Sequence, residues 1–156
     1  MTENEDFGSL GLSPEMLAAV EAKGFERPTP IQKLTIPILL DGRNDIIAQS
    51  QTGTGKTAAY GLPILQELVR GAGSVQAIVL VPTRELALQV TEELASYNRE
   101  KRLSIAAIYG GASKSEQLRR PILWWGRRGA CSTTSGARRS TFPASATSCW
   151  TRLTKC

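Results

Sequence analysis

Histidine is absent from the 156 residues, which excludes an imidazole general base and a zinc site with histidine ligands. No apolar run approaches the about 18 residues that a membrane span needs, and the acidic start from Thr2 to Asp6 is unlike a signal peptide. The three cysteines, Cys131, Cys149 and Cys156, are too few for a disulfide framework, and their spacing suits no metal site. These absences favour a globular cytoplasmic protein without a membrane partner.

Acidic residues are also missing from the last part of the chain. The net charge is +5, but all 14 Asp and Glu and 13 of the 19 Lys and Arg lie in residues 1–120, a net of −1. Residues 121–156 hold the other six cations, no acid, and every Trp and Cys, a net of +6. The composition therefore divides the chain near Pro121 into a balanced segment, 1–120, and a basic tail, 121–156.

The balanced segment alternates short apolar runs with helical patterns. Ser13-Pro14-Glu15 is typical of a helix start, with a capping Ser, a Pro at the first helical position and an early acid. Strands alternating with helices of this length predict parallel βαβ units. One helix is expected from Pro14, a second begins at Pro28-Thr29-Pro30 and ends at Asp41-Gly42, and two more are expected near 56–69 and 84–97. The expected strands are 45–48, 76–81 and 103–109.

A phosphate-binding loop is predicted where the first expected strand meets a helix. Its glycines, Gly53 and Gly55, allow a tight turn whose N–H groups point at phosphate oxygens, and the helix N-terminus attracts anions. Lys56 can reach the β- and γ-phosphates of a nucleotide, and the Thr57 hydroxyl can bind Mg²⁺. Ser50 stands where the general pattern has Gly; the alternative is a simple helix-capping turn. The loop reads Ser50, Gln51, Thr52, Gly53, Thr54, Gly55, Lys56, Thr57.

Three further motifs accompany this loop in order. They are Gly24-Phe25-Glu26-Arg27-Pro28-Thr29-Pro30-Ile31-Gln32, Pro82-Thr83-Arg84-Glu85-Leu86-Ala87 and Gly110-Gly111. With the loop, they make residues from about Phe7 to Arg120 resemble the first half of a DEAD-box ATP-dependent RNA helicase. The resemblance implies a RecA-like parallel sheet with flanking helices, ATP and Mg as cofactors, and RNA as the partner.

Gln32 and Phe7 are candidates for recognition of the base. A carboxamide offers one acceptor and two donors, which can pair with the N6/N7 edge of adenine. The resemblance implies that Gln32 reads adenine and that Phe7 packs on it. A lone glutamine would otherwise be interpreted as an exposed helix residue.

Contacts to RNA are implied at two places. Thr83 is a plausible helix cap after a strand, and Arg84 beside a helix N-terminus is also suited to an anion. By resemblance, Pro82, Thr83 and Arg84 contact the RNA sugar-phosphate backbone, as do Gly110 and Gly111 through bare backbone. Such contacts are independent of base sequence. Taken alone, Gly110-Gly111 could be only a turn.

Hydrolysis of a nucleotide needs an acid that holds Mg²⁺ and a group that positions water. The family supplies them in an Asp-Glu-Ala-Asp motif after a later strand, but the printed sequence has no Asp or Glu after Glu116. The family's second domain is missing as well. We therefore expect no complete catalytic set, and a truncated fragment that binds ATP without hydrolysing it.

The codons of the tail suggest a frameshift. Read from the third base of each codon, Trp124-Trp125-Gly126 must give Val-Gly and Cys149-Trp150 must give Leu-Asp, because Trp has a single codon. Codon degeneracy permits Thr-Pro-Gly-Arg after the first and Glu-Ala-Asp after the second, both family motifs in family order. We interpret residues from about Pro121 as translated out of frame. The alternative is a genuine basic nucleic-acid-binding tail.

The predicted fold is thus α/β, an incomplete RecA-like parallel sheet followed by an irregular tail. Residues 121–156, rich in Ser, Thr and Arg, are expected to be disordered. An incomplete sheet has an exposed edge, which favours aggregation, and the oligomeric state stays open. The rival hypotheses are a non-enzymatic nucleic-acid-binding module that uses the tail, and another phosphate-loop NTPase, which the Gln32 motif disfavours.

Overall fold

The computed structural model describes residues 6–71, 75–109 and the strand 123–126. The chain divides into two compact units, residues 1–68 with 93–102 and residues 69–92 with 103–156. The helix α4 (Arg84–Tyr97) begins in the second unit and ends in the first.

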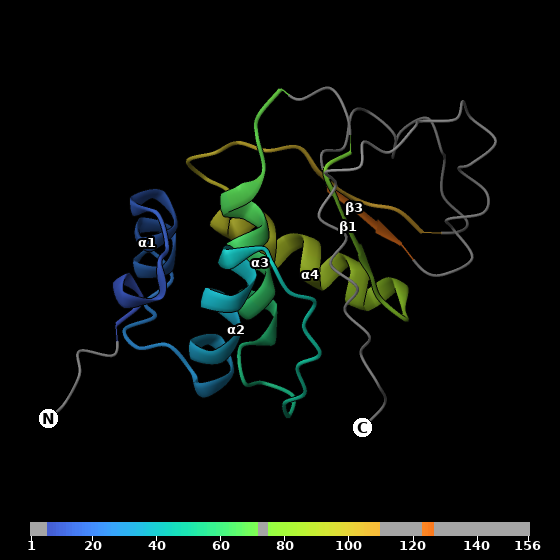
Figure 1. Ribbon diagram of the computed structural model, residues 1–156. Coiled ribbons are helices and arrows are strands. Elements are labelled where there is room, and N and C mark those ends of the chain that lie inside the picture. Colours follow the sequence, from blue (N-terminus) through green and yellow to red (C-terminus); the bar gives the residue numbers. More distant parts are fainter. Residues whose placement is uncertain (1–5, 72–74, 110–122, 127–156) are drawn as a thin grey trace, which may run out of the picture. The chain divides into compact units, whose positions relative to one another are not determined.

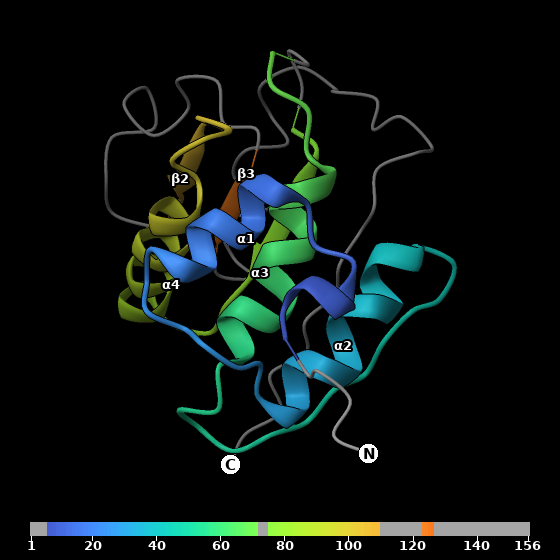
Figure 2. The same cartoon turned by 90° about the vertical axis from the view of Figure 1, so that its left-hand side faces the viewer.

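The first unit is helical. It contains a 3-10 turn η1 (Gly8–Leu10), α1 (Pro14–Glu21), α2 (Pro30–Asp41), α3 (Lys56–Glu67) and the last turn of α4. As predicted, Ser13 caps α1, and its hydroxyl accepts a hydrogen bond from Met16 N at 3.4 Å. Helices α2 and α3 lie side by side in both views (Figures 1 and 2). The buried Thr35 hydroxyl donates to Ile31 O at 2.7 Å within α2 and lies 3.4 Å from Ala59 O of α3.

The core of this unit forms where apolar faces of the helices meet. Its most deeply buried side chains are Met16, Val20, Ile36, Leu62, Pro63, Leu65, Leu94 and Tyr97. Burial, with the Glu93 carboxylate nearby, raises the pKa of the Tyr97 hydroxyl, so that group stays protonated and donates to Glu93. The end of α3 is tied down by Lys101, whose ammonium donates to the carbonyls of Gln66 and Leu68.

In its described residues the second unit has three parallel strands, β1 (Ala77–Leu80), β2 (Ile105–Ala107) and β3 (Leu123–Gly126). Their order is β1-β3-β2, with Ala77 and Ile105 both opposite Leu123. Two expected strands are therefore found, each shorter than the sequence suggested. Helices with parallel strands make this an α/β chain.

Two sequence expectations are wrong. Residues 45–48 were expected to form a strand, but they have no regular secondary structure and Ile47 is fully exposed, because no described strand pairs with them. The tail 121–156 was expected to be irregular, without packed structure from about residue 126, but within it 123–126 form β3. This segment belongs to the apolar run 122–125 in the sequence and is paired on both sides, which stabilises a strand. Residues 121, 122 and 127–156 lie outside the described part.

Candidate nucleotide site and nucleic-acid interface

The predicted phosphate loop has the backbone that its glycines allow. Gly53 and Gly55 have φ angles of +78° and +80°, in the left-handed region that favours glycine. Gly55 immediately precedes α3, and its carbonyl accepts the helical hydrogen bond from Ala59 N at 3.1 Å. The loop therefore delivers the chain into a helix N-terminus, where the first N–H groups and the helix dipole favour a bound anion.

Side chains of the loop hold its own backbone. The Thr54 hydroxyl donates to Gln51 O at 2.8 Å, so the hydroxyl of Ser50, 2.5 Å away, must be the donor between the two side chains. Ser50, which stands where the general pattern has Gly, is thus used inside the loop. The Lys56 ammonium donates to Ser50 O at 2.5 Å. The side chain at the end of the loop thus reaches back to the residue that begins it.

Side chains at the start of α2 bind the backbone of the phosphate loop, and these contacts are called the grip below. The Gln32 side chain is 3% exposed; its Oε1 accepts from Thr29 N at 2.9 Å, and its Nε2 donates to Gly55 O at 3.1 Å. The Thr29 hydroxyl donates to Thr54 O at 2.9 Å. Two side chains at the start of α2 therefore bind consecutive carbonyls of the phosphate loop.

This grip leaves no room at Gly55. A Cβ atom added there would lie 2.4 Å from Gln32 Nε2, whereas one added at Gly53 would meet nothing within 4 Å. Gly55 is thus required twice, by its φ angle and by the approach of Gln32. The sequence motifs gave Thr29 no role in this site, although a Thr at the cap of a helix and a Gln three residues later are the signal of a capping box.

Phe7 is buried, 5% exposed, directly before η1. The residues that follow it are attached to α3 by Gln66, whose Oε1 accepts from Ser13 N at 2.8 Å and whose Nε2 donates to Gly11 O at 3.2 Å. Nothing in the motif pattern pointed to Gln66, because its partners are backbone groups more than 50 positions away in the sequence.

Thr57 lies in the first turn of α3, half-buried, and can offer one hydroxyl oxygen to a magnesium ion. Among the residues that the structure describes, no group of three Asp, Glu, His or Cys side chains could hold a metal by itself. Mg²⁺ is commonly held by few protein ligands together with phosphate oxygens and water. The donor set therefore fits a magnesium ion that is bound together with a nucleotide.

The second unit contains the residues expected to contact RNA. Thr83 accepts from Leu86 N at 3.2 Å through its hydroxyl and so caps α4, as predicted. Arg84 is the first residue of α4, exposed, and its guanidinium carbon lies 4.3 Å from the centroid of the Tyr109 ring. Pro82 is exposed next to them, and Gly110 and Gly111 lie outside the described residues.

No helix in the described ranges is long and apolar enough to cross a membrane.

Comparison with known proteins identifies relatives of one kind. The family model of the DEAD/DEAH box helicases matches residues 29–133. The DEAD-box ATP-dependent RNA helicase CshA of Bacillus cereus is 55% identical over 113 residues, which are 72% of this chain and 21% of that protein. The ATP-dependent RNA helicase CshA of Listeria monocytogenes is 47% identical over 113 residues, 72% of this chain and 22% of that protein.

Solved structures agree with these relatives. A DEAD box protein from Methanococcus jannaschii superposes with a TM-score of 0.80 at 39% identity, covering 86% of this chain and 38% of that one. Dbp5 from S. cerevisiae, bound to RNA and ADP BeF3, gives a TM-score of 0.78 at 33% identity, covering 85% and 34%. The chain spans about a fifth of the length of the curated relatives that it matches. Since the family model covers more than half of these residues, the chain belongs to the DEAD/DEAH box helicase family.

Proposed function

We propose that this chain is the ATP-binding part of an ATP-dependent RNA helicase, with a RecA-like sheet to which β1 and β2 belong. The observation that carries the proposal is the phosphate loop with left-handed glycines at positions 53 and 55, gripped by Thr29 and Gln32 and opening α3. The names of the relatives support ATP as the nucleotide, and Dbp5 in complex with RNA and ADP BeF3 supports RNA as the second ligand.

In this proposal the loop N–H groups and Lys56 bind the phosphates of ATP, and Thr57 holds the magnesium ion that accompanies them. Gln32 and Phe7 bind the adenine. Each polar atom of the Gln32 carboxamide makes one hydrogen bond to the protein and can make a second, so the same side chain can fix the loop and contact a base.

The sugar-phosphate backbone of RNA is proposed to bind the second unit. Arg84 offers a planar cation to phosphate, next to the helix start that Thr83 caps, and Gly110 and Gly111 follow the segment after β2. These contacts read no base, which suits an enzyme that acts on strands of any sequence.

We expect the chain to bind ATP but not to hydrolyse it. The 156 residues offer no acid after Glu116 to hold Mg²⁺ or to position water, so ATP should bind without being hydrolysed. Steady release of phosphate by the purified chain would overturn this part of the proposal.

A titration of the full chain with ATP and Mg²⁺ tests the nucleotide site. Lys56→Ala removes a charge-assisted hydrogen bond to phosphate and should raise the Kd about 10- to 100-fold. Arg43→Ala is the matched control, because it also removes one cation, and the Arg43 side chain is 82% exposed and forms an ion pair with Asp41. Equal affinities of the Lys56→Ala and parent chains would contradict the proposal.

We also propose that residues from about Pro121 are translated out of frame. The family match to the printed residues extends to residue 133, so it does not mark a break at Pro121; the proposal rests on the codons, which permit Thr-Pro-Gly-Arg at residues 127–130 in the shifted frame. The nucleotide sequence across codons 115–156 decides: codons that do not spell the family motifs in the shifted frame end the idea. RNA binding that survives both Lys56→Ala and Arg84→Met would instead favour the basic-tail module.

A further inference from the structure

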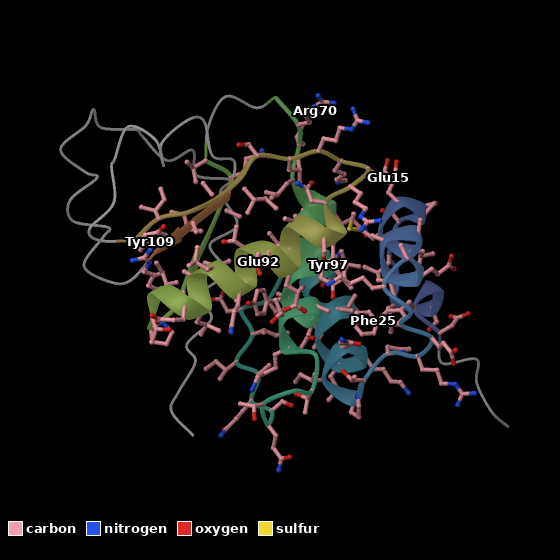
Figure 3. All side chains as sticks on the ribbon, turned by 180° about the vertical axis from the view of Figure 1, so that it is seen from behind. Glu15, Phe25, Arg70, Glu92, Tyr97 and Tyr109 are labelled. Carbon is pink, nitrogen blue, oxygen red and sulfur yellow. The ribbon has the colours of Figure 1, made fainter. Side chains whose placement is uncertain are left out.

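Tyr109 has no part in the proposed ATP or RNA contacts, yet its ring contacts Arg84. The guanidinium carbon of Arg84 lies 4.3 Å from the ring centroid, within the range of a cation–π stack. Figure 3 shows Tyr109 near the start of α4, the end that carries Arg84. Both residues belong to the second unit.

The sheet explains why residues 25 positions apart in the sequence meet. Arg84 follows β1 and Tyr109 follows β2, and both strands run parallel to β3 in matching register. The carboxyl ends of parallel strands lie at one edge of a sheet, and ligands of such sheets commonly bind there. The stack thus joins Arg84, in one segment that the resemblance assigns to RNA, to Tyr109, which directly precedes the other, Gly110-Gly111.

We infer that Tyr109 is a positioning residue for RNA binding: its ring holds the Arg84 guanidinium in the orientation that receives a backbone phosphate. This inference rests on the proposed RNA-binding function of Arg84.

The physical reason is conformational entropy. An exposed arginine loses much rotamer freedom when it is immobilised on a phosphate, and a side chain already stacked on a ring loses less. The guanidinium has five N–H donors, so a contact of its carbon with the ring is compatible with hydrogen bonds to phosphate oxygens. No ion pair joins Arg84 to a carboxylate within the part of the chain that the structure describes, so its charge is not already neutralised by one there.

The test measures binding of a short single-stranded oligouridylate to the full chain at several salt concentrations. Tyr109→Leu should raise the Kd about 2- to 5-fold, the range of an exposed cation–π contact, without changing the salt slope, because no charge is lost. Tyr109→Phe keeps the ring and should bind like the parent. Arg84→Met should weaken binding and lower the salt slope by about one.

The decisive measurement is the coupling between the two residues. In an Arg84→Met chain, Tyr109→Leu should have no further effect on the Kd; the same loss with and without Arg84 would overturn the inference. Phenylalanines of increasing fluorination at position 109 keep the ring but weaken its negative face, so affinity should fall stepwise with fluorination. If Tyr109→Leu does not fold, the fluorinated series still tests the inference. Equal affinities for all members of the series would refute the cation–π contact.

Failure of the proposed function looks different. If Arg84→Met changes neither affinity nor salt slope, both the RNA role of Arg84 and the inference are wrong. If Arg84→Met weakens binding but Tyr109→Leu does not, only the inference falls. Binding of ATP, which depends on Lys56, is measured in parallel to verify that every variant is folded.

Discussion

The phosphate loop and the segment that leads into it are neighbours in the sequence, but only one of them took the predicted conformation. Residues 50–57 have the expected turn and helix start, held by side-chain hydrogen bonds from Thr29, Gln32 and the loop itself. Residues 45–48 have no regular structure, and Ile47 is fully exposed. Glycine conformations and short-range hydrogen bonds are encoded locally, whereas a strand exists only beside a partner.

The largest effect is expected at Gly55. Gly55→Ala places a Cβ at φ +80° and 2.4 Å from Gln32 Nε2, so it should lower the free energy of unfolding by about 3 kcal/mol, from left-handed strain and overpacking together. Gly53→Ala is the matched control: it has φ +78° but open space and should cost about 1 kcal/mol. Urea unfolding of both variants measures the difference, and equal costs would mean that α2 does not grip the loop.

The next effect is expected at Gln32. Gln32→Leu leaves Thr29 N and Gly55 O without their bonds to this side chain, which should cost about 2 kcal/mol and loosen the loop. The Kd for GTP should therefore rise, and the Kd for ATP should rise further if Gln32 also contacts adenine. An unchanged Kd for GTP would show that the grip does not support phosphate binding.

The same substitution at the other end of α3 provides the control. Gln66 also makes two hydrogen bonds to backbone groups, but it lies in the last turns of α3, away from the loop that precedes this helix. Gln66→Leu should cost about 1 kcal/mol of stability and leave the Kd for GTP unchanged.

These contacts mark the limit of what the sequence alone could predict. The helix α4 lies where it was expected, near 84–97, and α2 lies within the stretch expected between Pro28 and Gly42, because prolines, glycines and the cap Thr83 are local signals. Gln32 was singled out for adenine, but its bond to Gly55 O crosses 23 positions and needed coordinates. The same holds for the Arg84–Tyr109 stack, which depends on strand register.

The strands show the same limit more sharply. Ala77–Leu80 and residues 46–48 are both short apolar runs, and both were expected to lie in strands. The first is paired with β3, and its Ala77 and Val79 are buried; the second has no described partner. β3 lies in the tail that was expected to be irregular. It was not predicted because its pairing partners are distant in the sequence and because the tail as a whole is rich in Ser, Thr and Arg.

A smaller effect is expected at Thr29. Thr29→Val keeps the shape of the side chain but removes the hydrogen bond to Thr54 O, which should cost about 1 kcal/mol and weaken ATP binding a few-fold. Thr91→Val is the control, because the Thr91 hydroxyl only donates to Ala87 O within its own helix, a contact that adds little stability. Unfolding and ATP titration of the pair measure the difference; equal losses would assign no special role to Thr29.

The smallest effect is expected at Ile47, and it tests the other side of the comparison. Ile47→Ser should change the free energy of unfolding by less than about 0.5 kcal/mol, because a fully exposed side chain loses no buried contacts. Ile36→Ser, at a fully buried position of α2, should cost more than about 3 kcal/mol in the same urea experiment. A cost above about 1 kcal/mol at Ile47 would mean that residues 45–48 are packed in solution. The strand predicted from the sequence would then form after all, and the contrast with the phosphate loop would disappear.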